Sequence, residues 1–182
     1  PYRELIIIDD GDERFSTIGD WVHAQKPGKG YLNDVMYHAK GSGKNLARWA
    51  VNVDPGQYRV SVTWTTHSNR ATNAPYTVAF GGQQIGFVRV NQESEPDDLQ
   101  SKGTLWENLG TFHLVENGEL SVSLSDDANE YVIADAVRIE RILYPPTPAQ
   151  YQKIIDDGEE GFSENGMWQR FPLSGYHGDF RY

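Results

Sequence analysis

The sequence contains no cysteine and no long run of apolar residues. The lack of cysteine excludes disulfide bonds, thiolate zinc sites and thiol catalysis, but it leaves the cellular compartment open. A transmembrane helix needs about 20 predominantly apolar residues, so we expect no insertion into a membrane. Residues 1–25 also lack the charged and then apolar pattern of a signal peptide. We expect any targeting segment to lie upstream of Pro1.

Positive charge is scarce, with 16 Lys and Arg against 26 Asp and Glu and a net charge of -10. Proteins that bind nucleic acid without sequence specificity neutralise its phosphates with clustered Lys and Arg. No basic run occurs in this chain. The sequence therefore predicts no nucleic-acid partner.

Familiar catalytic motifs are missing as well. The chain has no His-Glu-x-x-His, no Gly-x-Ser-x-Gly and no strand-bound Gly-x-Gly-x-x-Gly pattern. Residues 41–44, GSGK, resemble part of a phosphate loop, but Asn45 stands where Ser or Thr should bind Mg²⁺. The five histidines show no metal-ligand spacing. We therefore predict that the protein is not an enzyme.

What the chain does contain is an internal repeat. Residues 6–21 read IIIDDGDERFSTIGDW, and residues 153–168 read KIIDDGEEGFSENGMW. After a two-residue gap the match continues, so that Gly30, Tyr31, Asp34 and Tyr37 fall opposite Gly175, Tyr176, Asp179 and Tyr182. Self-similarity at a fixed period indicates an array of modules. We expect one module of about 145 residues and the truncated start of a second, within a longer protein.

Alternating apolar and polar residues predict several short strands. Segments 48–53 and 57–66, joined by Asp-Pro-Gly, are predicted to form an antiparallel hairpin. Two further hairpins are predicted, one joining 76–80 to 85–90 through Gly81-Gly82 and one joining 111–115 to 120–124 through Asn117-Gly118. The last strand is predicted at 131–142. Because no helical apolar stripe appears, the pattern predicts an all-β jelly-roll sandwich.

A proline-rich segment marks the expected domain boundary. Residues 144–148, YPPTP, favour an extended spacer because proline cannot donate a ladder hydrogen bond. We therefore expect a β-sandwich at 1–143, a linker at 144–148 and a partial second repeat at 149–182. The last segment is too short to bury its own aromatic residues, which we expect to pack on the first domain or on a partner chain, or to stay exposed. A dimer through the partial repeat is one expected outcome.

Several motifs resemble one known family. They are residues 68–78 (SNRATNAPYTV), 90–92 (VNQ), 109–112 (LGTF) and 124–138 (LSDDANEYVIADAVR). Over residues 6–142 the chain is similar to the golvesin and xanthan-lyase carbohydrate-binding-like domain, a module of secreted bacterial proteins. The resemblance implies a galactose-binding-like β-sandwich and an extracellular or cell-surface location. The chain departs from the family in an acidic insertion within residues 91–108 and in Glu130, which stands in place of Gly.

Polar and aromatic residues near these motifs are candidates to bind a glycan by hydrogen bonding and ring stacking. In the 68–78 loop, the alternative is a structural role, with Asn69 and Asn73 bonded to their own backbone and Arg70 paired with a nearby acid. We expect Trp49 and Trp64 to lie in the core instead. The candidate ligand-binding residues are Trp21, Tyr31, Asn69, Arg70, Asn73, Tyr76, Asn91, Gln92 and Trp106.

Asp135 has the period of a buried position. If Ile133 and Val137 face inward, Asp135 faces inward with them, and a buried carboxylate must be hydrogen-bonded, paired or bound to a metal. Backbone N–H donors or an arginine are one solution, and Ca²⁺ is the other, because hard oxygen ligands suit it. The candidate Ca²⁺ ligands are Asp9, Asp10, Asp126, Asp127 and Asp135.

Two functions from different classes follow from these observations. The first is a non-catalytic carbohydrate-binding-like module of a large secreted or surface protein, with a polysaccharide as its partner. The alternative is a structural or adhesive repeat that contacts neighbouring repeats or chains and binds no sugar, because arrays need contacts between units.

Overall fold

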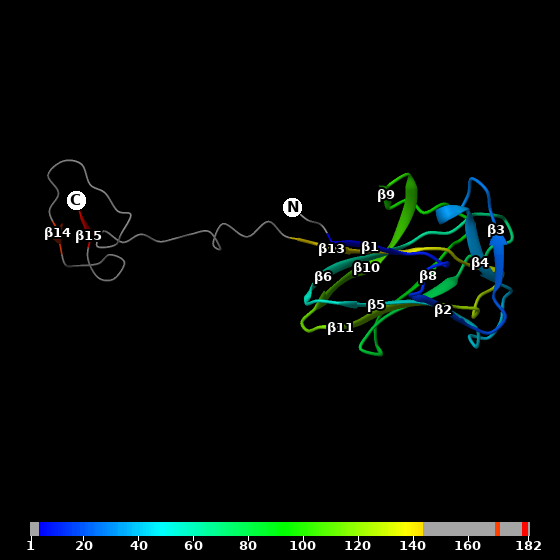
Figure 1. The fold of residues 1–182 in the computed structure, drawn as a ribbon, viewed down its shortest axis with the longest axis horizontal. Helices are drawn as coiled ribbons and strands as arrows, with labels where there is room; N and C mark the ends of the chain where they lie inside the picture. The colour runs from blue at the N-terminus through cyan, green and yellow to red at the C-terminus, as the bar shows by residue number, and fades with distance from the viewer. Residues whose placement is uncertain (1–3, 144–169, 172–179, 182) are drawn as a thin grey trace. The chain divides into compact units, whose positions relative to one another are not determined.

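Figure 1 shows the computed structural model of the protein, which describes residues 4–143, 170–171 and 180–181. The backbone divides into two compact units, Pro1–Leu143 and Tyr144–Tyr182. Within the described ranges, no helix is long and apolar enough to cross a membrane. The predicted linker 144–148 lies outside the described residues, as does most of the predicted partial repeat 149–182.

The larger unit is a sandwich of antiparallel sheets. One sheet has the order β1 (Leu5–Ile8), β13 (Val137–Arg141), β6 (Gly56–Val62), β10 (Thr104–Leu114) and β9 (Leu99–Ser101). The facing sheet has the order β2 (Phe15–Ile18), β5 (Leu46–Val53), β11 (Gly118–Ser125), β7 (Ala74–Phe80) and β8 (Gln83–Val90). A smaller sheet joins β12 (Val132–Ala134), β4 (Asp34–His38) and β3 (Val22–Gln25). The prediction of an all-β sandwich is confirmed.

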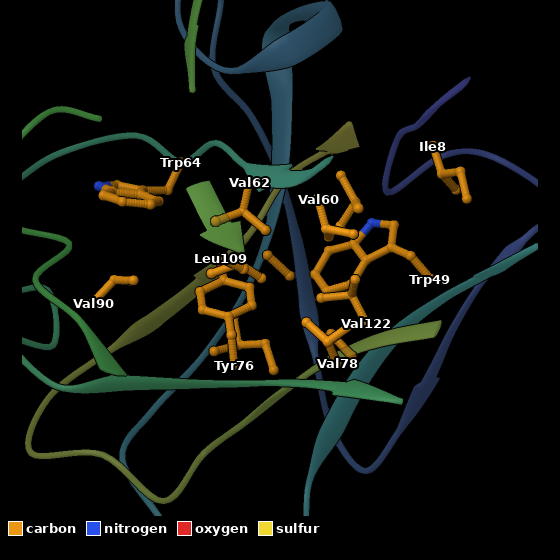
Figure 2. Close-up of a cluster of buried hydrophobic side chains, with 14 of the residues drawn as sticks. Ile8, Trp49, Val60, Val62, Trp64, Tyr76, Val78, Val90, Leu109 and Val122 are labelled. Atoms are coloured by element: carbon orange, nitrogen blue, oxygen red, sulfur yellow. The ribbon is translucent and has the colours of Figure 1, made fainter. Parts of the chain in front are cut away.

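The two large sheets enclose one apolar core. Strand β6 contributes Tyr58, Val60 and Val62, which occupy alternate positions of the strand and are at most 1% exposed. Figure 2 shows these valines beside Trp49 from β5, with Trp64 at the margin of the same cluster. Trp49 and Trp64 are 1% and 6% exposed, so the prediction that they belong to the core is confirmed.

The predicted hairpin between β7 and β8 is present. Its two-residue connection consists of Gly81 and Gly82, with φ angles of 56° and 80°. A type I′ turn needs positive φ at both central residues, which glycine adopts without steric cost. The Gly-Gly pair therefore sets this turn.

The other two predicted hairpins are wrong. Strands β5 and β6 belong to different sheets, and so do β10 and β11. Neither Gly56 nor Gly118 has a positive φ, so neither connection is a tight hairpin turn. Alternation identifies the buried face of a strand but not its hydrogen-bonded neighbour, because a strand can pack across the sandwich from the next one in sequence.

The predicted last strand, 131–142, is also interrupted. Strand β12 pairs with β4 in the small sheet, whereas β13 pairs with β1 and β6 in the first large sheet. Asp135 and Ala136 separate the two strands. The chain thus changes sheets at the residue whose inward carboxylate the sequence singled out.

The second unit contains one described strand pair. Strand β14 (Arg170–Phe171) pairs antiparallel with β15 (Phe180–Arg181), Arg170 opposite Arg181 and Phe171 opposite Phe180. When the two-residue gap of the repeat is placed in the connecting loop, these pairs correspond to His23 with Met36 and Ala24 with Val35. Those are pairs of the β3–β4 register. The described strand pair of this unit thus has the same register as the β3–β4 residues with which the repeat aligns it.

Candidate functional site

A group of carboxylates lies where β1 ends and β4 begins. Carboxylate oxygens of Asp9, Asp10 and Asp34 all lie within 4.8 Å of one another. Asp9 and Asp10 are each only 8% exposed. One oxygen of Asp9, one of Asp34 and both of Asp10 are buried without a hydrogen-bond partner. We call these three residues together with Asp135 the aspartate cluster.

Asp135 supplies the deepest carboxylate of the cluster. Its side chain is fully buried, and its Oδ1 accepts a hydrogen bond of 2.9 Å from the backbone N–H of Tyr31. Its Oδ2 is buried without a partner. A Cβ on Gly30 would lie 2.5 Å from the carbonyl oxygen of Asp34, so only glycine lets the chain approach Asp135 in this way. The predicted backbone donor is therefore present, but it satisfies only one of the two oxygens.

Burial and mutual repulsion keep protons on this cluster. Burial first, and then repulsion from Asp34 and Asp12, raises the pKa of Asp9 to about 6. Burial together with Asp9 and Asp34 raises the pKa of Asp10 to about 7. The pKa of Asp135 is raised well above its usual value by burial first and then by Asp10, Asp9 and Asp34. No arginine or lysine offsets these charges; the exposed His23, 2.8 Å from Asp34, is the one basic partner among the described residues.

The donor set fits a hard divalent cation. Ca²⁺ takes six to eight oxygen ligands at about 2.3–2.6 Å, so two oxygens on one ion are at most about 5 Å apart. The spacing of Asp9, Asp10 and Asp34 is within that limit. Four carboxylates with five buried, unpartnered oxygens would lose their mutual repulsion around such an ion.

Two of the predicted metal ligands lie elsewhere. Asp126 accepts hydrogen bonds from the backbone N–H of Gly43 at 2.7 Å and from Nδ2 of Asn45 at 2.5 Å. Its pKa is lowered because these bonds outweigh its burial. Asp127 forms an ion pair of 2.8 Å with Arg89. The structure brings neither residue into the aspartate cluster.

Asp34 is not among the metal ligands predicted from the sequence. It follows Gly30 and Tyr31, and in the repeat it corresponds to Asp179. The alignment of the two repeat copies was the available signal, because it pairs these aspartates as it pairs Asp9 and Asp10 with Asp156 and Asp157.

A second feature is a pocket of about 300 Å³ beside the small sheet. It is lined by Ala24, Lys26, Tyr37, Asn69, Arg70 and Tyr131. The rings of Tyr37 and Tyr131 lie edge to face, with centroids 6.1 Å apart. We call it the Tyr37–Tyr131 pocket. It contains two of the predicted ligand-binding residues, Asn69 and Arg70, together with two tyrosines that sequence analysis did not single out as candidates.

The loop that carries Asn69 and Arg70 is held by backbone contacts. Arg70 forms an isolated parallel bridge with Tyr131, and the N–H of Ala71 donates to the carbonyl of Tyr131 at 2.7 Å. The Asn73 side chain accepts a hydrogen bond from the N–H of Asn129 at 2.8 Å. The Asn73 side chain thus bonds the backbone of another loop rather than its own, and the 68–78 loop presents Asn69 and Arg70 from a fixed backbone.

Three other candidate ligand-binding residues form hydrogen bonds within the protein. Tyr76 and Gln92 are buried, and Gln92 Nε2 donates to Tyr76 Oη at 3.2 Å. Asn91 is exposed, and its side chain accepts a hydrogen bond from the N–H of Glu93 at 3.0 Å. These contacts fix the start of the acidic insertion against the core.

The candidates Trp21, Tyr31 and Trp106 do not form one exposed aromatic surface. Trp106 is fully buried, with the ring of Tyr31 packed 5.9 Å from it. Trp21 is 9% exposed and packs 5.5 Å from the ring of His38. A ring buried in this way leaves little free face for a sugar. Of the three, Tyr31 is the half-buried one.

A further cavity of about 330 Å³ lies between the 28–30 turn and the acidic insertion. Its lining includes Lys29, Trp64, Thr65 and Glu95. The Trp64 Nε1 donates to the carbonyl of Ser94 at 2.9 Å, which holds the insertion over the end of β6. The cavity is polar and carries charges of both signs.

Comparison with known proteins identifies the family of the larger unit. The family model of the Golvesin C-terminal domain matches residues 6–141. This chain belongs to that family. It is 29% identical over 148 residues to xanthan lyase of Bacillus sp. (strain GL1), covering 76% of this chain and 15% of that protein. The chain thus spans only a small part of this relative.

Two solved structures are similar to the fold. The structure of Paenibacillus xanthan lyase aligns with a TM-score of 0.63 and 28% identity, over 76% of this chain and 13% of that one. A family 35 carbohydrate-binding module from Clostridium thermocellum aligns with a TM-score of 0.51 and 13% identity, over 74% and 97% of the two chains. The Golvesin-type domain is therefore an all-β jelly-roll sandwich that resembles carbohydrate-binding modules.

Proposed function

We propose that this chain is a non-catalytic carbohydrate-binding module that holds a glycan in the Tyr37–Tyr131 pocket. One observation carries the proposal: two tyrosine rings, an asparagine and an arginine line one open pocket. Its asparagine and arginine come from the 68–78 loop. Aromatic faces and planar polar side chains are the groups that stack on sugars and bond their hydroxyls. The similarity to carbohydrate-binding modules and to a polysaccharide lyase supports the same function.

This function implies a location outside the cell. Polysaccharides are too large and too polar to cross a membrane unaided, so a module that binds them meets them at the cell surface or beyond it. We therefore propose an extracellular or cell-surface protein.

Replacement of Tyr131 by alanine tests the binding site. We expect Tyr131→Ala to weaken binding to polysaccharides on an array or in affinity electrophoresis by about tenfold, which is about 1.4 kcal/mol, because a stacking face is lost. Phe87→Ala is the matched control, since Phe87 is an aromatic residue that is 50% exposed on β8, outside the pocket. If the wild-type protein bound no glycan, or if both variants lost binding equally, the proposed site would be wrong.

We further propose that the aspartate cluster binds Ca²⁺ as a structural ion. The carboxylate spacing and the unpartnered, fully buried Oδ2 of Asp135 are two separate indications. A ligand that binds only the folded state at a hundredfold excess over its Kd stabilises it by about 2.7 kcal/mol, which is about 5–10 °C in melting temperature for a domain of this size. An unchanged melting temperature between excess chelator and excess Ca²⁺ would remove this proposal.

The second candidate function is a structural or adhesive repeat. The specific observation in its favour is the β14–β15 register, which matches β3–β4 in the repeat alignment. Units of an array stabilise one another through contacts between neighbours. Size-exclusion chromatography of the full chain beside a chain ending at Leu143 separates the candidates, because dimers or larger species only in the full chain favour the structural function.

A further inference from the structure

Arg70 differs from the other arginines of the larger unit. Residues 4–143 contain seven arginines, and six of them form ion pairs with Asp or Glu. Arg70 is the exception among them. In a chain with a net charge of -10, a guanidinium without an acidic partner is unexpected on composition alone.

The polar contacts of Arg70 leave part of its guanidinium unused. Its Nη1 donates to Asn69 Oδ1 at 3.0 Å. Its Nε is buried without a partner, and no described residue accepts a hydrogen bond from Nη2. The cation is thus partly desolvated, but within the described structure only one amide oxygen compensates it. An anion at the exposed end of the guanidinium would provide the missing partner.

Lys26 adds a second positive charge to the same pocket. It is half-buried, and no ion pair involves it among the described residues. Two acids that lie within three residues of the pocket tyrosines have other partners, since Glu130 lies 3.5 Å from Lys40 and Asp34 lies 2.8 Å from His23. The lining of the pocket contains two cations and no carboxylate.

We propose that the Tyr37–Tyr131 pocket selects a carboxylate-bearing sugar, a hexuronate residue within a polysaccharide. The carboxylate binds Arg70 and Lys26, and the ring packs against Tyr37 and Tyr131. A guanidinium donates two parallel hydrogen bonds to a carboxylate, and an ammonium adds a point charge. This inference rests on the proposed carbohydrate-binding function and names the class of sugar that the same pocket takes.

Binding of matched small ligands to the full chain tests the inference. D-Glucuronate and D-glucose differ in a carboxylate against a hydroxymethyl group, and acetate offers the carboxylate without a ring. We expect NMR titrations to give at least tenfold tighter binding of glucuronate than of either comparison ligand, both in Ca²⁺ and in EDTA, which excludes carboxylate binding through a metal. Polygalacturonate and its methyl ester extend the same contrast to polymers, and dextran sulfate tests whether any polyanion suffices.

Two variants locate the binding. Lys26→Gln and Arg70→Gln are expected to weaken glucuronate binding by about threefold and at least tenfold, and each is expected to weaken glucose binding by a smaller factor. Lys29→Gln is the matched control, because Lys29 lies three residues from Lys26 and lines the other cavity. If Arg70→Gln fails to fold, Lys26→Gln carries the test, since the Lys26 side chain makes no hydrogen bond or ion pair with the described residues.

The possible outcomes distinguish a failure of the uronate preference from a failure of the proposed carbohydrate-binding function. If glucose and glucuronate bind the pocket equally, the module function stands and the preference for acids is wrong. If acetate or dextran sulfate binds as well as its uronate counterpart, the pocket takes anions in general and the inference is overturned. If Lys29→Gln alone weakens binding, the pocket is the wrong one. If no sugar binds at all, both proposals fall.

Discussion

Asp9, Asp10 and Asp34 bring like charges into one small volume that little water reaches. A carboxylate in such a place costs free energy unless it is protonated or meets a cation. The raised pKa values of Asp9 and Asp10, about 6 and about 7, express that cost. The stability of the metal-free protein must therefore depend on pH in a defined direction.

The metal-free protein is predicted to lose stability as the pH rises from about 4 to about 7. Asp9 and Asp10 have higher pKa values in the folded state than the usual 3.8, so the folded state holds more protons in this range and its free energy of unfolding falls with rising pH. The pKa of His23, raised by its hydrogen bond to Asp34, acts in the same direction. Thermal melts in chelator across this range measure the effect. A melting temperature that rises with pH would contradict it.

Asp10→Asn separates repulsion from metal binding. The substitution removes one charge, so we expect the chelator-treated variant at pH 8 to melt at or above the wild-type temperature, while most of the gain from Ca²⁺ disappears. Asp20→Asn is the matched control, because Asp20 is exposed and lies outside the cluster. A variant that loses stability in chelator and keeps the full gain from Ca²⁺ would show that Asp10 has a different role.

At the scale of single residues, the sequence predicted which side chains are buried better than which side chains contact one another. The period of two placed Asp135 inward correctly, since it is fully buried. It also paired Asp135 with Asp126 and Asp127, which the structure places elsewhere, because nearness along the chain does not determine which loops meet at one end of a sandwich. Arg70 was expected either to pair with an acid or to meet a ligand, and only the coordinates show that no described acid is its partner.

At the scale of elements, Gln92 connects the end of β8 to β12. Its Nε2 donates to the carbonyl of Ile133, and its Oε1 accepts from the N–H of Ile133, both at 2.8 Å. Gln92 is fully buried, and its side-chain amide bonds the backbone N–H and carbonyl of Ile133 as a neighbouring strand would. The motif that carried the family resemblance at 90–92 thus has a structural reason.

Gln92→Leu is predicted to destabilise the protein by about 1–3 kcal/mol, because it leaves the buried N–H of Ile133 without an acceptor. That loss corresponds to a fall of roughly 2–12 °C in melting temperature for a domain of this size. Gln84→Leu is the control, since Gln84 is exposed on β8. A melting temperature unchanged in Gln92→Leu but lowered in Gln84→Leu would contradict the assignment.

The element scale also shows where strand prediction fails. Gly81 and Gly82 determine a turn by their backbone angles, so the β7–β8 hairpin could be predicted from two residues. The connections at 54–55 and 115–117 contain turn residues too, but they carry the chain from one sheet to the other. Which sheet a strand joins depends on pairing between distant segments, such as β1 with β13, and local patterning does not encode that choice.

At the scale of the whole chain, the backbone divides into two compact units. The compact unit Pro1–Leu143 contains all of the matched family region 6–141. The described core residues of this unit come from β1 to β13 and the loops between them. The described residues 4–143 thus form an apolar core of their own.

A chain ending at Leu143 is therefore predicted to melt within about 2 °C of the full chain and to show the same gain from Ca²⁺, because 1 kcal/mol shifts the melting temperature of such a domain by about 2–4 °C. Differential scanning calorimetry of both chains at equal molar concentration measures this. A melting temperature more than about 5 °C lower in the shortened chain would mean that residues 144–182 contribute to the same cooperative unit. If the difference appeared only at high protein concentration, association through the second unit would be its cause, because the stability of an associating protein depends on its concentration.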